Sequence, residues 1–128
     1  MRTEGSLKEN VVKRMVLQHA TTDPAIESIQ AALRLSQDAL ARMLDLSVRT
    51  IVRWEGGEGP PSLERERLEL ISEVVEIAKD IMKPEDLPIW FSSPKEAFSD
   101  RRPLDLLSSF KEIQQMRDLL EKTRWGIF

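Results

Sequence analysis

The chain has 128 residues, of which 41% are hydrophobic and 32% are charged, a balance typical of one soluble domain or of two very small ones that share a core. Its 19 lysines and arginines against 22 aspartates and glutamates give a net charge of −3, so any binding of nucleic acid must come from a local patch. Cysteine is absent, which excludes disulfides, thiolate metal sites and cysteine nucleophiles. His19 is the one histidine, so any histidine-based site would have to use it.

The sequence also lacks the signatures of a membrane span, a signal peptide and a phosphate-binding loop. No apolar stretch is long enough to span a membrane, and the first residues, MRTEGSLKEN, lack the apolar core of a signal peptide, so we expect a cytoplasmic protein. The glycine-rich run at 56–59 has no Lys-Ser/Thr after it and is interpreted as a linker, not a phosphate loop. With so few candidate nucleophiles and bases, the sequence predicts a protein that is not an enzyme and that has no cofactor and no metal.

Hydrophobic residues repeat at a period near 3.6 almost throughout, which predicts an all-α fold. The first predicted helix lies within about residues 6–19. The second starts at Thr22 or Asp23, good N-cap residues with a proline directly after them, and runs to about Leu35. Ser36 and Ser47 are predicted to cap the two short helices that follow, and the Gly/Pro run at 56–61 ends the second of these.

A long helix is predicted over about 63–82, with Ser62 as its cap. It carries two neighbouring apolar stripes, so we expect it to pack on both sides. The first stripe is Leu68, Ile71, Val75, Ala78 and Met82, and the second is Leu70, Val74, Ile77 and Ile81. The second stripe is the first candidate for a homodimer surface, and residues 6–19 are the second candidate.

Pro84 and Pro88 are expected to end the long helix. A short helix through Phe98, a turn at 99–102, a helix that begins at Pro103 and a last helix over about 111–123 complete the prediction. The chain is therefore divided into an N-terminal helical extension (1–22), a helix-turn-helix unit with the long linking helix (23–83) and a small helical C-terminal domain (84–128).

Residues 36–55, SQDALARMLDLSVRTIVRWE, have the spacing of a helix-turn-helix, in which two short helices bury a shared face across a tight turn. The spacing leaves Val48, Arg49, Val52 and Arg53 on the outward face. The segment resembles the helix-turn-helix of the Xre/Cro family of phage-repressor-like DNA-binding domains over roughly residues 23–82. The matching residues are Gln37, Leu40, Ala41, Leu46, Ser47, Thr50, Ile51, Trp54, Glu55 and Gly57.

This resemblance implies that the second helix of the pair enters the major groove of operator DNA. The residues expected to contact phosphates or base edges are Gln37, Ser47, Val48, Arg49 and Arg53. One motif reads only a short half-site, so a homodimer on a near-palindrome is expected. Two positions depart from the family: Asp45 stands at the turn where glycine is usual, and Gln30 stands where an arginine often pairs with the glutamate.

The alternative is a helical hairpin that only packs and does not bind DNA. Residues 23–60 carry four basic and six acidic side chains, which favours this alternative. The outward arginines 34, 42, 49 and 53 favour DNA contact, because packing does not require them.

Aromatic residues are concentrated near the C-terminus: two of the three tryptophans and all four phenylalanines follow residue 89. This part resembles the toxin-binding domain of Xre/MbcA/ParS-type antitoxins, from RES–Xre toxin–antitoxin systems, over about residues 84–126. The match rests on Trp90-Phe91, Pro94, Phe98, Pro103 to Leu107, Ser109, Leu119-Leu120 and Gly126. The family commonly has glycines where this chain has Ser99-Asp100 and Phe110-Lys111-Glu112.

The two resemblances together imply an antitoxin that blocks a RES-domain, NAD-degrading toxin and represses its own operon. The residues expected to contact the toxin are Arg102, Pro103, Arg124, Trp125, Gly126, Ile127 and Phe128. Two arrangements of the tail stay open: it plugs the active-site cleft of the toxin, or Trp125 and Phe128 fold back on their own helix. For Trp90, Phe98 and Leu107 we expect core packing.

The alternative function is a stand-alone Xre-family transcriptional regulator whose C-terminal lobe dimerises or senses a small ligand. The product of the neighbouring gene discriminates between the two functions, since only an antitoxin needs a toxin beside it.

Overall fold

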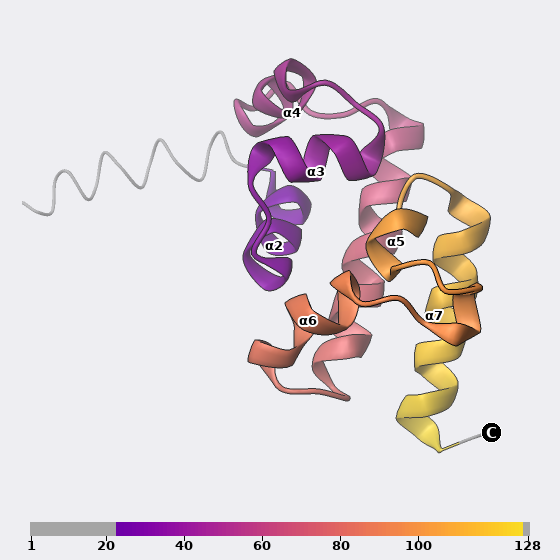
Figure 1. Cartoon of the computed structure of the whole chain (residues 1–128). Coiled ribbons are helices and arrows are strands. Elements are labelled where there is room, and N and C mark those ends of the chain that lie inside the picture. The colour runs from indigo at the N-terminus through magenta and orange to yellow at the C-terminus, as the bar shows by residue number, and fades with distance from the viewer. Residues whose placement is uncertain (1–22, 127–128) are drawn as a thin grey trace, which may run out of the picture.

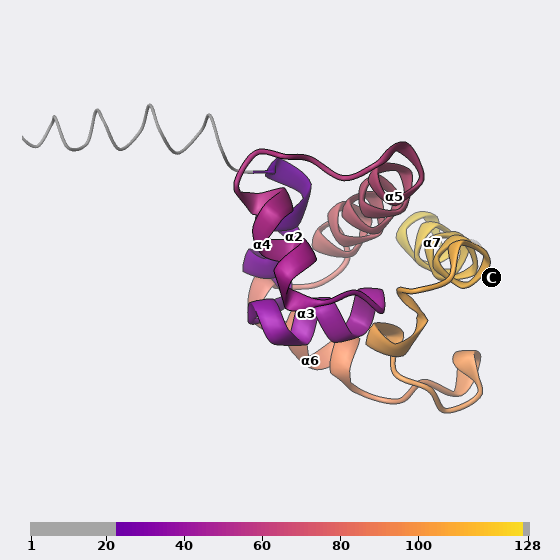
Figure 2. The same ribbon diagram turned by 90° about the horizontal axis from the view of Figure 1, so that it is seen from above.

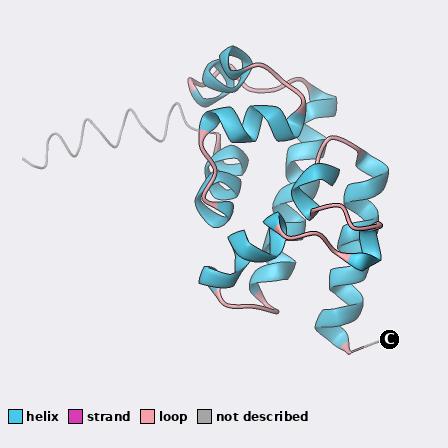
Figure 3. Ribbon diagram, viewed as in Figure 1, coloured by secondary structure: helices cyan, strands magenta, loops and turns pink. Residues whose placement is uncertain are grey.

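The computed structural model describes residues 23–126, so the predicted helix at 6–19 and the tail residues Ile127 and Phe128 lie outside the described residues. Within 23–126 the structure is all-α, with no strand beyond one isolated bridge between Lys95 and Arg101 (Figures 1 and 3). The α-helices are α2 (Pro24–Leu33), α3 (Gln37–Leu44), α4 (Val48–Glu55), α5 (Ser62–Lys79), α6 (Leu87–Ser92) and α7 (Phe110–Trp125). Three 3-10 turns join them: η1 (Pro84–Asp86), η2 (Glu96–Phe98) and η3 (Pro103–Leu106).

The first three helices begin at the capping residues that the sequence predicts. Asp23 accepts hydrogen bonds from the backbone amides of Ala25 (3.0 Å) and Ile26 (3.4 Å) at the start of α2. Ser36 caps α3 and Ser47 caps α4 in the same manner, each through its side-chain hydroxyl. These caps satisfy amides that have no partner within the helix, which is why short polar residues mark the starts so well.

The long helix α5 departs from the prediction at both ends. Its N-cap is Pro61, and Ser62 is the first helical residue rather than the cap. The helix ends at Lys79, before either proline. Pro84 and Pro88 instead lie in the first turns of η1 and α6, where the fixed φ of proline and its missing N–H do no harm. The two prolines therefore start the next elements and do not end α5.

Both apolar stripes of α5 are covered within the chain. The helix lies between α2 on one side and α7 on the other (Figure 2). Val74 and Ile77, from the second stripe, are buried, as are Leu68 and Ile71 from the first. The prediction that α5 packs on both sides is confirmed. The second stripe faces the chain's own helices, however, so it is not available as the homodimer surface for which it was the first candidate.

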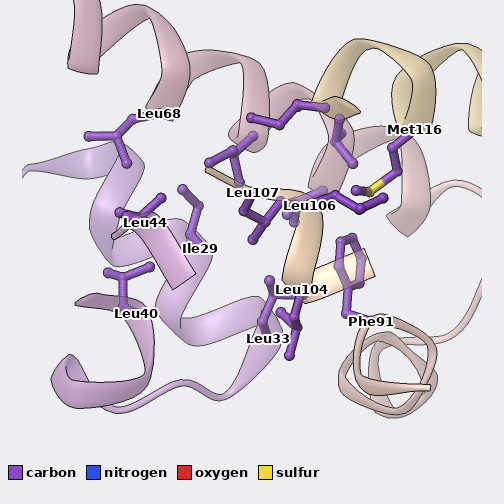
Figure 4. Close-up of a cluster of buried hydrophobic side chains, with 14 of the residues drawn as sticks. Ile29, Leu33, Leu40, Leu44, Leu68, Phe91, Leu104, Leu106, Leu107 and Met116 are labelled. Carbon is purple, nitrogen blue, oxygen red and sulfur yellow. The ribbon is translucent and has the colours of Figure 1, made fainter. Parts of the chain in front are cut away.

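One hydrophobic core joins the two halves of the described chain. Leu106 and Leu107, around the end of η3, fill the space between Leu44 of the helix-turn-helix and Met116 of α7 (Figure 4). α6 packs against α2, and η3 packs against α3. Within residues 23–126 the surfaces of α4 and α7 are thus held on one continuous packed unit.

The aromatic residues after α5 behave largely as the sequence predicts. Phe98 and Leu107 are buried, and Phe91 is buried with them. Trp90 is half-buried, and its ring meets the rings of Phe91 and Phe98 edge to face, with centroids 5.0 and 6.4 Å apart.

Candidate DNA-binding and protein-binding surfaces

The turn between α3 and α4 has the geometry that the sequence predicts. Asp45 holds a left-handed backbone with φ of 61°, and its N–H points back to the carbonyls of Ala41 and Arg42. Aspartate tolerates this conformation better than most residues, so the turn forms without glycine. Ile51 and Trp54 are buried beneath α4, which fixes the opposite face of the helix toward solvent.

The predicted DNA-contact residues gather at the exposed face of α4 and the start of α3. Gln37, Ser47, Arg49 and Arg53 are exposed. Val48 is half-buried and packs partly against the core, so it is the least available of the set. Among the described residues Arg49 forms no hydrogen bond or ion pair through its side chain, which leaves its guanidinium available to an anionic ligand.

Two carboxylates border this surface. The side-chain amide of Gln37 donates a hydrogen bond to Oε1 of Glu55, which links α3 to α4. Gln30, at the family's arginine position, donates instead to the carbonyl of Leu35 (3.4 Å). The donor to Glu55 is therefore the neutral amide of Gln37 on α3, and Gln30 of α2 does not pair with this glutamate.

The second carboxylate is in the loop after α4. Nε of Arg53 donates to Oε1 of Glu58 at 3.1 Å, between two exposed side chains. Neither Gln37 nor Arg53 is therefore free of the protein, and a bound phosphate would compete with a carboxylate for each.

The end of α7 carries the second surface. The side chain of Trp125 is exposed, with 67% of its surface accessible. Its indole Nε1 donates to Oε1 of Glu121 at 3.0 Å, and the guanidinium of Arg124 lies 5.1 Å from the ring centroid. Gly126 ends the helix with φ of 70°, a conformation that favours glycine. Trp125 is therefore largely exposed and outside the core, and its ring lies against Glu121 and Arg124 of its own helix.

Arg124 is anchored to a different helix. Its Nη1 donates to Oδ2 of Asp80, just after α5, at 2.9 Å, and its Nη2 donates to both oxygens of Glu121 at 2.7 and 2.9 Å. The hydrogen bond to Asp80 is the main cause that raises the pKa of Arg124. Burial opposes this rise, and the hydrogen bond to Glu121 adds to it. The guanidinium is thus fixed as a charged group between α5 and α7.

Arg102 and Pro103 lie elsewhere. Arg102 forms a two-pronged pair with Asp105 at 3.0 and 2.7 Å, and its hydrogen bonds lower the pKa of that carboxyl. Pro103 is buried, so its role in this structure is packing. Both residues precede α7, whose 16 residues span about 24 Å, whereas Trp125 is at its far end. The predicted protein-binding residues therefore do not form one patch.

The sequence pattern did not indicate Asp80, Glu121 or Glu58, which hold the side chains of the two surfaces. For Asp80, however, the sequence contains a repeated spacing of charges that could have indicated its partner. Arg117 pairs with Glu73 (3.5 Å) as Arg124 pairs with Asp80, so two acid–base pairs share a separation of 44 residues, one heptad apart. Paired charges at i and i+7 on two helices that run in the same direction are a detectable pattern.

Residues 23–126 lack two other kinds of feature, a metal site and a membrane-spanning helix. No group of three or more His, Cys, Asp or Glu side chains gathers there to hold a metal ion. No helix in the same residues is both long and apolar enough to cross a membrane.

The comparison with known families divides the chain in two. Residues 29–77 match the helix-turn-helix family, and residues 78–126 match the family described as antitoxin Xre/MbcA/ParS C-terminal toxin-binding domain. Together the two matches cover α3 to α7 and the second half of α2.

Individual relatives match most of the chain. The mycobacterial cidal antitoxin MbcA of Mycobacterium bovis, and that of Mycobacterium tuberculosis, is 26% identical over 110 residues, which cover 85% of this chain and 93% of the relative. The fold is similar to a chain of the crystal structure of the M. tuberculosis MbcT–MbcA toxin–antitoxin complex, with a TM-score of 0.66 and 24% identity over 81% of this chain and 93% of that chain.

Proposed function

From a chain that joins a helix-turn-helix domain to a C-terminal domain of the antitoxin Xre/MbcA/ParS toxin-binding family, we propose that this protein is an antitoxin that neutralises a cognate toxin and represses its own operon. The observation that carries the proposal is the order of the two matches, which run one after the other along a single packed unit. We further propose that the toxin is of the RES type and degrades NAD, as the resemblance of residues 84–126 implies.

The arrangement of the two surfaces supports two separate binding functions. α4 lies at one end of the molecule and the end of α7 lies at the other (Figure 1). A DNA duplex on α4 would therefore leave the end of α7 open to a protein. Trp125 is the best-supported toxin contact, because an exposed tryptophan beside an arginine has the composition of an interface anchor.

Exposed arginines support the DNA-binding part of the proposal in spite of the acidic net charge. The segment α2–α4 carries four exposed arginines: Arg34, Arg42, Arg49 and Arg53. Of these four, only Arg53 forms an ion pair with another described residue. We propose that Arg49 and Arg53, with Ser47 and Gln37, contact the operator. A homodimer would then place two copies of α4 on successive half-sites.

The antitoxin proposal is tested by co-expression with the product of the neighbouring gene. We expect that gene alone to stop growth, and this chain to restore growth and to co-purify with the product. Consumption of NAD in cells that express the neighbour alone would identify the toxin class. A harmless neighbour that forms no complex would contradict the proposal and favour a stand-alone transcriptional regulator.

The DNA-binding part is tested with the double variant Arg49→Ala, Arg53→Ala. We expect it to lose at least about tenfold in affinity for the promoter DNA of its own operon, because each arginine contributes a phosphate or base contact. Growth rescue should be unchanged, since neither residue lies near α7. Arg117→Ala, which removes an arginine far from α4, is the matched control and should bind the promoter as the unmodified chain does.

The salt dependence of binding provides an independent check on the same step. Affinity for the promoter should fall steeply between low and physiological salt despite the net charge of −3, since counterions are released from DNA. Equal promoter affinity of the double variant and the unmodified chain, or a flat salt response, would show that α4 does not contact DNA.

A further inference from the structure

We propose that Asp80 and Glu121 are positioning residues that hold Trp125 as a preformed anchor, which inserts into an apolar pocket of the protein partner. This inference rests on the proposed antitoxin function and specifies how the contact is built. It starts from the juxtaposition of an exposed tryptophan with three charged side chains from two helices.

The contacts fix the indole from two directions. Glu121 accepts the Nε1 hydrogen of Trp125 at 3.0 Å, one helical turn before it. Arg124 covers the ring at 5.1 Å, and Asp80 holds Arg124 from the end of α5 at 2.9 Å. Only 25% of the Arg124 side chain is accessible, so the cation that covers the ring is itself well packed. An exposed ring without such contacts would exchange among several rotamers.

The same contacts define the chemistry of the partner. The indole N–H is already satisfied by Glu121, so covering Trp125 leaves no unpaired donor in the interface. The pocket that receives it therefore needs no hydrogen-bond acceptor for the ring and can be entirely apolar. Because Arg124 occupies one side of the ring, the partner meets the remaining face and the edge.

Preorganisation gives Asp80 an effect on binding that exceeds its effect on folding. A side chain that is already ordered loses less entropy on association, so the free energy gained on burying it is retained. The ion pair itself is on the surface and contributes little to folding stability, since 60% of the Asp80 side chain is accessible. Loss of Asp80 should therefore loosen Arg124, which keeps its hydrogen bonds to Glu121, and with it the cover on the ring of Trp125, while the fold remains.

The chain contains a matched control for this step. Glu73 and Arg117 form the same kind of ion pair between α5 and α7, one heptad earlier and away from Trp125. Asp80→Ala and Glu73→Ala each remove one partly exposed carboxylate from the same helix pair. Asp80→Glu keeps the charge and serves as the rescue variant.

The first measurement uses the free chain. Two-dimensional nitrogen–proton NMR resolves the indole groups of the three tryptophans, and Trp125→Phe identifies the signal of Trp125. We expect Asp80→Ala to increase the fast motion of the Trp125 indole, and Glu73→Ala and Asp80→Glu to leave it as in the unmodified chain. Equal motion in Asp80→Ala and Glu73→Ala would overturn the inference, whatever the toxin does.

The second measurement uses the complex with the purified product of the neighbouring gene. Asp80→Ala should weaken binding about fivefold, mainly through faster dissociation, with a melting temperature close to that of Glu73→Ala. Trp125→Ala should weaken binding about a hundredfold. Unchanged binding in Trp125→Ala overturns the anchor, whereas an unmodified chain that fails to bind at all overturns the proposed function itself.

Discussion

Within residues 23–126, four residues other than glycine hold a left-handed backbone: Arg34, Asp45, Ser99 and Asp100. Asp45 stands at a helix-turn-helix turn where the family it resembles usually has glycine, so its conformation could be predicted from the sequence, whereas for Ser99 and Asp100 no left-handed backbone was predicted. The conformation of Arg34 could not be predicted, because the helical pattern of α2 continues through Leu35 and nothing marks the position as a turn. The left-handed backbone of Arg34 turns the chain, so that the amide of Leu35 also bonds to the carbonyl of Gln30, at 3.0 Å, and the helix ends there.

This conformation makes Arg34 a site where glycine should stabilise the protein. A left-handed backbone costs about 1 kcal/mol for a residue with a Cβ and almost nothing for glycine. We expect Arg34→Gly to raise the free energy of unfolding by about 1 kcal/mol in denaturant titration. Arg34→Ala removes the same charge but keeps the Cβ, so a gain of equal size in both variants would assign the effect to charge instead.

At the scale of the elements, the starts of helices were more predictable than their ends. Caps are local, and Asp23, Ser36 and Ser47 begin their helices as the sequence indicates. The predicted end of α5 was wrong because a proline can either end one helix or begin the next, and Pro84 and Pro88 begin the next elements. The double stripe of α5 predicted two packed sides, but periodicity alone cannot say whether the second partner is α7 or another copy of the chain.

Asp23 joins two elements through one side chain, which can be separated by mutation. It caps α2 and also accepts a hydrogen bond from Arg65 of α5 at 3.0 Å, although the aspartate side chain is only 3% accessible. We expect Asp23→Ala to lower the free energy of unfolding by about 1–2 kcal/mol, since it removes the cap and the ion pair together. Asp23→Asn keeps an acceptor for the cap and should lose less; equal losses would show that the ion pair, not the cap, is what matters.

At the scale of the whole molecule, the sequence indicated both surfaces but not how they are held. The exposed face of α4, which we propose contacts DNA, follows from helical spacing, because that face is what remains once Ile51 and Trp54 turn inward. The support of Trp125 by Asp80 depends on the register between α5 and α7, which only the packed structure defines. The burial of Pro103 has the same origin, since its neighbours in the core come from distant segments.

The shared core predicts that the described chain unfolds as one unit. Trp54 is buried under α4, whereas much of the helix content lies in α5 and α7. In the variant Trp90→Phe, Trp125→Phe, the fluorescence of Trp54 and the far-ultraviolet circular dichroism should give the same midpoint in denaturant. If fluorescence and circular dichroism gave different midpoints in this doubly substituted protein, the helix-turn-helix would unfold independently of the C-terminal helices.

For the proposed binding to operator DNA, the continuity of α5 between α2 and α7 has a geometric consequence. Because α4 and the end of α7 belong to one packed body, a copy seated in the major groove points its Trp125 in a fixed direction relative to the DNA axis. Two copies on half-sites one helical turn apart, about 34 Å, would present their captured proteins at a fixed distance and angle. The base-pair spacing of the operator would then determine how the two bound proteins are placed relative to each other. Inserting half a helical turn of DNA between the half-sites would move one of them to the opposite side of the duplex.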